Sequence, residues 1–146
     1  MTRHKAVSKI LEVKEFTREQ LEAEAKKAQA HLNAEQDKLN GLEESFKNTS
    51  VELMSKQTRG TMPVHECELF TTYLKHLGRL IDQQKRIVAI RTAELEVKQK
   101  MMVEAYREHR LIEILRDKIA QDEAKDAAHD EQKEADYQYL TRKAER

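Results

Sequence analysis

The chain has 146 residues, of which 38% are hydrophobic and 37% charged, with three glycines, one proline and no tryptophan. This composition is typical of long helices and coiled coils, because a sheet or barrel needs more turn residues. Lysine plus arginine equals aspartate plus glutamate at 27 each, and the resulting formal net charge of +0 argues against a protein that binds nucleic acid by neutralising phosphates.

A first long helix is predicted from about residue 3 to about residue 57. Two rows of residues recur along it at intervals of seven, which is the spacing of a coiled-coil seam. One row is Leu11, Arg18, Ala25, Leu32, Leu39, Phe46 and Leu53, and the other is Lys14, Leu21, Ala28, Glu35, Leu42 and Thr49. Nine of these thirteen residues are apolar. The charged members Lys14, Arg18 and Glu35 interrupt the seam, and polar seam residues lower stability while setting register.

The only strong break in the pattern is a predicted turn at residues 58–62. Gly60 suits the end of one helix, and Pro63 suits the first turn of the next, where its missing N–H does no harm. Helices joined by so short a connection pack as antiparallel neighbours. Partner residues should then have numbers that add up to roughly 120, which places Leu53 near Phe70 and Leu32 near Val88.

A second helix is predicted from about residue 63 to about residue 143, since its apolar residues recur at spacings of three and four. Its apolar row ends near Ile119, where the row of the first helix also runs out of partners. The part beyond about residue 120 should project as a single helix. The sequence thus predicts an all-α protein, an antiparallel two-helix coiled-coil hairpin in a single domain over 1–146, with the second helix longer than the first.

The apolar stripe of the second helix is wider than one partner helix can cover. Tyr73, Leu80 and Ile87 recur seven apart beside the seam row. Either part of this stripe faces solvent or a second protein, or Phe46 and Leu42 of the first helix cover it. Both interpretations stay open from the sequence.

No catalytic, cofactor-binding or metal site is predicted, and the chain is not expected to be an enzyme. His65, Glu66 and Cys67 are adjacent on a helix and therefore point in different directions, so they make a poor metal set. The single cysteine fits a reducing compartment. No run of 18 apolar residues could span a membrane, and the charged start of the chain does not resemble a signal sequence, so secretion is not expected.

The chain resembles the flagellar type III export proteins of the FliJ family, which form the stalk of the export ATPase. The matching features are the segment 6–15 (AVSKILEVKE), the Gly60 turn, the segment 70–77 (FTTYLKHL) with Ile81 and Gln84, the segment 91–95 (RTAEL) and the segment 102–115 (MVEAYREHRLIEIL). Their order and spacing extend over nearly the whole chain. The resemblance implies a stalk that promotes assembly and activity of a hexameric export ATPase, without cofactors.

The resemblance also implies which surfaces bind partners. Contact with the cytoplasmic domain of the export gate membrane protein would involve Lys38, Leu42, Phe46, Tyr73, Leu77, Leu80 and Gln84. Contact with the ATPase pore would involve Arg3, Lys5, Lys9, Ile119 and Lys125 at the terminal end of the hairpin. Export chaperones would be further partners, and the protein would be cytoplasmic, held at the inner face of the membrane through the export apparatus without inserting into it. The alternatives are the equivalent stalk of a virulence-type secretion system and a generic coiled-coil scaffold that dimerises.

Overall fold

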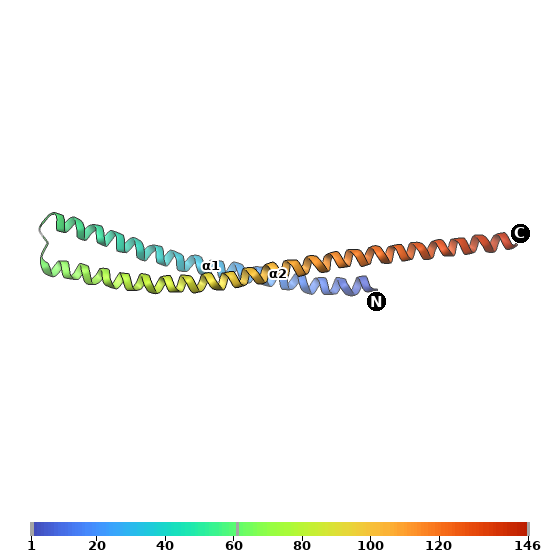
Figure 1. Ribbon diagram of the computed structural model, residues 1–146, viewed down its shortest axis with the longest axis horizontal. Coiled ribbons are helices and arrows are strands. Elements are labelled where there is room, and N and C mark those ends of the chain that lie inside the picture. The colour runs from blue at the N-terminus through green and yellow to red at the C-terminus, as the bar shows by residue number, and fades with distance from the viewer. Residues whose placement is uncertain (1, 61, 146) are drawn as a thin grey trace. The chain divides into compact units, whose positions relative to one another are not determined.

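The computed structural model describes residues 2–60 and 62–145, and it consists of two long helices (Figure 1). Helix α1 is Arg3–Thr58, with 56 residues, and helix α2 is Val64–Glu145, with 82 residues. The described residues contain no strand. The helices pack against each other as a hairpin whose second helix is the longer, so the predicted fold class is confirmed.

The connection between the helices uses backbone geometry that only glycine adopts easily. Gly60 has a φ of 70°, and its N–H donates to the carbonyl of Gln57 at 3.1 Å, which closes the end of α1. The carbonyl of Pro63 accepts a hydrogen bond from the N–H of Cys67 at 3.1 Å. Pro63 therefore caps α2 from the position before its first residue, one place earlier than the first-turn position that the sequence suggests.

The chain divides into two compact units, and the unit Glu22–Lys100 contains the turn. Its buried residues are Ala25, Leu39, Leu77, Gln84 and Leu95, all members of heptad rows. Each row faces the opposite helix because a seven-residue repeat keeps one stripe of a helix on one side. Two ion pairs between the helices border this seam: Lys56 Nζ lies 2.8 Å from Glu66 Oε1, and Lys98 Nζ lies 2.9 Å from Glu24 Oε2.

The other unit comprises Met1–Leu21 and Met101–Arg146. Val7, Leu11 and Ala105 are its buried residues. Polar contacts between the helices add to this small apolar core. They are the ion pair from Lys14 Nζ to Glu108 Oε2 at 2.9 Å, the Arg18 guanidinium 5.2 Å from the centre of the Tyr106 ring, and the main-chain N–H of His4, which donates to Glu123 Oε1 at 3.3 Å. A single domain over residues 1–146 stays a prediction.

The pairs between helices report the register directly. In the ion pairs Lys14–Glu108, Lys56–Glu66 and Lys98–Glu24, which join α1 to α2, the two residue numbers add up to 122, and for Glu35 and Gln84 they add up to 119. These values lie close to the predicted sum. Beyond Glu123, every described residue from 124 to 145 is exposed, so this stretch of α2 has its whole circumference free.

Candidate functional site

A stripe of apolar side chains on α2 stays exposed within the unit Glu22–Lys100. Tyr73, Ile87 and Ile90 are 49%, 38% and 59% exposed, and Leu80 is half-buried. Tyr73, Leu80 and Ile87 are seven residues apart and Ile90 follows by three, so they share one side of the helix. We call these four residues the α2 stripe. Leu42 and Phe46 of α1 do not cover it, and this apolar surface is available to a partner.

The charges beside the α2 stripe are basic. Arg79 and Arg86 each directly precede a member of the stripe and are exposed. On the same flank of the seam, α1 contributes Lys38, whose Nζ lies 3.5 Å from Glu35 Oε1. The positions of α2 on this flank between Tyr73 and Ile90 carry no acidic side chain. Apolar surface bordered by cations suits an amphipathic helix with carboxylates along its edges.

The residues predicted to contact the export gate fall into two groups. Lys38, Phe46, Tyr73 and Leu80 are wholly or partly exposed; Phe46 is 37% exposed. Leu77 and Gln84 instead lie in the seam between the helices, at 4% and 8% exposure, and Leu42 is half-buried beside them. The hairpin therefore presents part of the predicted set to a partner and uses the rest to pack its own helices.

The Gln84 side chain forms a polar layer with Glu35 across the seam. Its Nε2 donates to Glu35 Oε2 at 2.6 Å and to the main-chain carbonyl of Glu35 at 2.9 Å. The pKa of the Glu35 carboxyl is lowered from its ordinary value, chiefly because the Gln84 amide donates to the carboxylate, with the charges of Lys38 and Arg91 adding to the effect. Glu35 thus remains a carboxylate that accepts from both helices.

The residues predicted to contact the ATPase lie in the unit with both chain ends. Arg3, Lys5, Lys9 and Lys125 are exposed, whereas Ile119 is half-buried. An exposed apolar face that the sequence analysis missed accompanies them. Ile10, Val13 and Phe16 of α1 are 48%, 63% and 61% exposed, and Leu111 and Leu115 of α2 are 65% and 44% exposed. The signal was present in the sequence as apolar residues outside the heptad rows.

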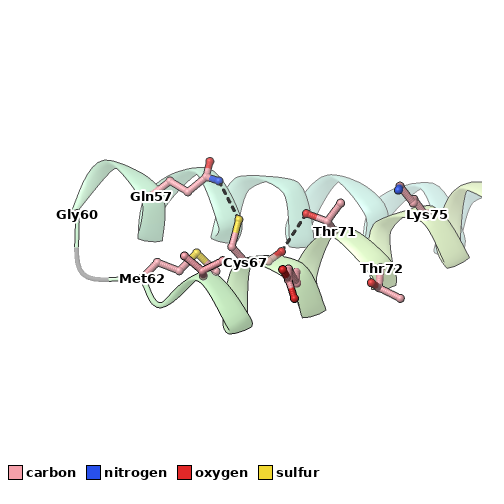
Figure 2. A pocket seen from close by; sticks show the side chains of 9 residues that line it. Gln57, Gly60, Met62, Cys67, Thr71, Thr72 and Lys75 are labelled. Carbon is pink, nitrogen blue, oxygen red and sulfur yellow. Dashed lines mark hydrogen bonds between the residues drawn. The ribbon is translucent and has the colours of Figure 1, made fainter.

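The residues around the turn enclose an open groove of about 580 Å³ (Figure 2). Gln57, Met62, Cys67, Thr71 and Lys75 are among its lining residues. Gln57 Nε2 donates to Cys67 Sγ at 3.4 Å, and Thr71 Oγ1 donates to the Cys67 carbonyl at 2.9 Å, as Figure 2 shows. These contacts hold Cys67 as part of the helix packing and do not set a base beside its thiol.

Two further observations concern metal sites and membrane-spanning segments in the described part of the chain. Within residues 2–60 and 62–145, no group of three or more histidine, cysteine, aspartate or glutamate side chains is arranged to hold a metal ion. Over the same residues, neither helix has a stretch that is long and apolar enough to cross a membrane.

Comparison with known proteins identifies the family. The model of the family described as "Flagellar FliJ protein" matches residues 4–142, nearly the whole chain. No curated protein and no solved structure matches the chain significantly.

Proposed function

Because the chain belongs to the flagellar FliJ family, we propose that it is a non-enzymatic stalk of the flagellar type III protein export apparatus. Family membership indicates a role related to flagellar export. The finer proposal is that the terminal end of the hairpin enters the pore of the hexameric export ATPase, promotes its assembly and raises its activity. Cytoplasmic export chaperones and the export gate are the other proposed partners, and binding to the gate would hold the protein at the inner face of the membrane.

The observation that carries the proposal is the uncovered end of α2. All described residues from 124 to 145 are exposed, and Tyr137, Tyr139 and Leu140 there are 71%, 66% and 62% exposed. An isolated helix of this length is only marginally stable in water, so a surrounding partner would stabilise it. Arg3, Lys5, Lys9, Ile119 and Lys125 belong to the same unit and are the residues that we propose near the pore.

The ATPase arm of the proposal is tested by mixing purified components. The full chain added to the purified export ATPase should raise its rate of ATP hydrolysis and the fraction of hexamers. A chain that ends at Glu123 keeps every described contact between the helices and should lose most of this stimulation. Equal stimulation by the two chains, or none by either, would refute insertion of this end. Cross-links from Arg3 and Lys125 to pore residues would locate the contact.

The gate arm concerns the α2 stripe together with Lys38. We propose that the exposed Lys38 and Tyr73 and the half-buried Leu80 contact the gate, with Leu42 and Phe46 at the edge. Leu77 and Gln84 support this surface from within the seam, since both are buried. An amphipathic segment with acidic edges would match the apolar stripe and its basic border.

The double variant Tyr73→Ala with Leu80→Ala should bind the purified cytoplasmic domain of the gate at least ten-fold more weakly than the parent chain. A loss of about 1.4 kcal/mol in binding free energy corresponds to a ten-fold loss of affinity. Met54→Ala is the matched control, because Met54 is 68% exposed but lies on the other flank of α1. Equal loss in the control, or no loss at Tyr73 and Leu80, would contradict the assignment. A stable dimer of the free chain in sedimentation would favour a dimerising scaffold instead.

A further inference from the structure

Gln84 is the one polar residue among the buried described residues, at 8% exposure. It lies on α2 in the same heptad row as Leu77 and Arg91. Both of its acceptors belong to Glu35 of α1: the Oε2 atom at 2.6 Å and the main-chain oxygen at 2.9 Å. An amide removed from water needs these partners, because a buried donor without an acceptor is costly.

The apolar rows on either side of this layer do not by themselves select one alignment. Both helices repeat every seven residues, so a slide of one heptad again places apolar residues opposite apolar residues. In either direction the slide would move Gln84 opposite Leu42 or Ala28, neither of which offers a side-chain acceptor. Gln57 and Val64 at the turn are exposed, so a few residues there could unwind to permit a slide. The Glu35–Gln84 bond is therefore available in one register.

The other polar seam residues are less selective. Arg91 Nη1 lies 3.0 Å from Glu94 on its own helix, so this pair survives any slide. Lys98 pairs with Glu24 on α1, but its side chain is 38% exposed. After a slide, this long and flexible side chain could place its ammonium group in water or beside another carboxylate. The short Gln84 amide lacks this reach. Main-chain carbonyls recur at Leu42 and Ala28 in a shifted register, but the carboxylate that accepts from Gln84 is offered by Glu35 and not by those two residues.

We propose that Gln84 is a positioning residue: by binding Glu35 it sets the register of α1 against α2 within the unit Glu22–Lys100. The Glu35 carboxylate divides its oxygens, with Oε2 on Gln84 and Oε1 3.5 Å from Lys38 Nζ. Register therefore also decides which part of the α2 stripe stands beside Lys38. The importance of this arrangement for binding the gate rests on the proposed function, whereas the role of Gln84 in setting the register does not.

The test measures register in the free, full-length chain. Spin labels are attached to cysteines introduced as Ala30→Cys and Arg79→Cys, two exposed sites on different helices, in a Cys67→Ser background. The parent should give one distance. Gln84→Leu should add a second population displaced by about 10 Å, because seven residues of helix rise about that far. Gln84→Met, an unbranched side chain of similar length, is measured beside it in case the branched leucine disturbs folding.

Two further variants separate register from stability. Val88→Ala weakens an apolar layer of the same helix and should lower the melting temperature while keeping a single distance. The exchange Glu35→Gln with Gln84→Glu again pairs an amide with a carboxylate and should restore the single parental distance. The proposal is overturned if folded Gln84→Leu and Gln84→Met both keep the parental distance, or if Val88→Ala broadens it equally. Because no partner is present, the result is independent of the ATPase and gate assays.

Discussion

Replacing Leu77 by alanine tests whether the seam between the helices holds the hairpin together. Leu77 has the lowest exposure of the buried hydrophobic residues, at 4%. Leu→Ala in protein cores costs about 2–5 kcal/mol, depending on how far the surroundings close the gap. A seam of two helices has solvent on both flanks and can close more easily than a thick core, so we expect the free energy of unfolding to fall by about 2 kcal/mol, at the low end of that range.

The assay is urea unfolding followed by circular dichroism at 222 nm, with the free energy taken from the midpoint and the slope. Leu69→Ala is the matched control: it removes the same atoms from the same helix and the same unit, but Leu69 is 59% exposed. The control should change stability by less than about 0.5 kcal/mol. If the two variants lose the same stability, or if Leu77→Ala loses less than about 0.5 kcal/mol, burial in the seam does not carry the fold and the reasoning fails.

Deleting residues 124–146 should leave the urea midpoint unchanged, because every described residue removed is exposed; a lower midpoint would reveal a packing role for this end. Since the Gln84 amide holds the pKa of Glu35 below its ordinary value of 4.5, the stability that Glu35 contributes is complete above pH 4.5 and is lost as pH falls through the lowered pKa. Urea midpoints measured across this acid range should therefore fall more steeply for the parent than for Glu35→Gln, and parallel curves would contradict the linkage. Gly60→Ala should destabilise the hairpin by about 1 kcal/mol, because a φ of 70° is strained for alanine. Gly41→Ala, inside α1 where an added Cβ meets nothing within 4 Å, should stabilise the hairpin by roughly 0.5–1 kcal/mol. The same urea titration checks both variants, and a change of stability in the same direction for both would be evidence against the turn geometry.

The hairpin was predictable because two independent features of the sequence agree. The heptad rows require two long helices, and the single break near Gly60 makes them antiparallel neighbours. The sum rule also placed Leu53 and Phe70 on facing stretches, and the ion pair of Lys56 with Glu66 joins the two helices about one turn away, nearer the connection. The seven-residue recurrence of apolar residues extends over many helical turns, so a few polar residues in a row do not obscure it. The fold class could therefore be predicted from this recurrence.

The finer features of the surfaces were harder to predict. A sum of roughly 120 pairs Glu35 with Lys85, yet the structure pairs it with Gln84. Neighbouring residues of a helix point about 100° apart, so an error of one residue exchanges an exposed side chain for a seam side chain. Within the predicted gate surface, Tyr73 and Leu77 are four residues apart and therefore point only about 40° apart, yet Tyr73 is exposed and Leu77 is buried. Spacing in sequence shows that a stripe exists, but its exposed edge depends on the register between the helices.

Both units join their helices by the same two kinds of contact, and this bears on the proposed role. In the unit Glu22–Lys100 the seam includes Leu39, Leu77 and Leu95, all buried. In the unit that holds the chain ends, Val7 and Leu11 are buried. Each unit also has ion pairs with partly exposed charges, such as Lys14–Glu108 at 37% and 58% side-chain exposure and Lys98–Glu24 at 38% and 50%. An exposed ion pair contributes only about 0–1 kcal/mol, much less than a buried leucine. In both units, therefore, the buried apolar residues contribute most to the pairing of the helices. Residues 124–145 lie beyond these contacts and are exposed, so a partner can enclose this end without breaking a described contact between the helices.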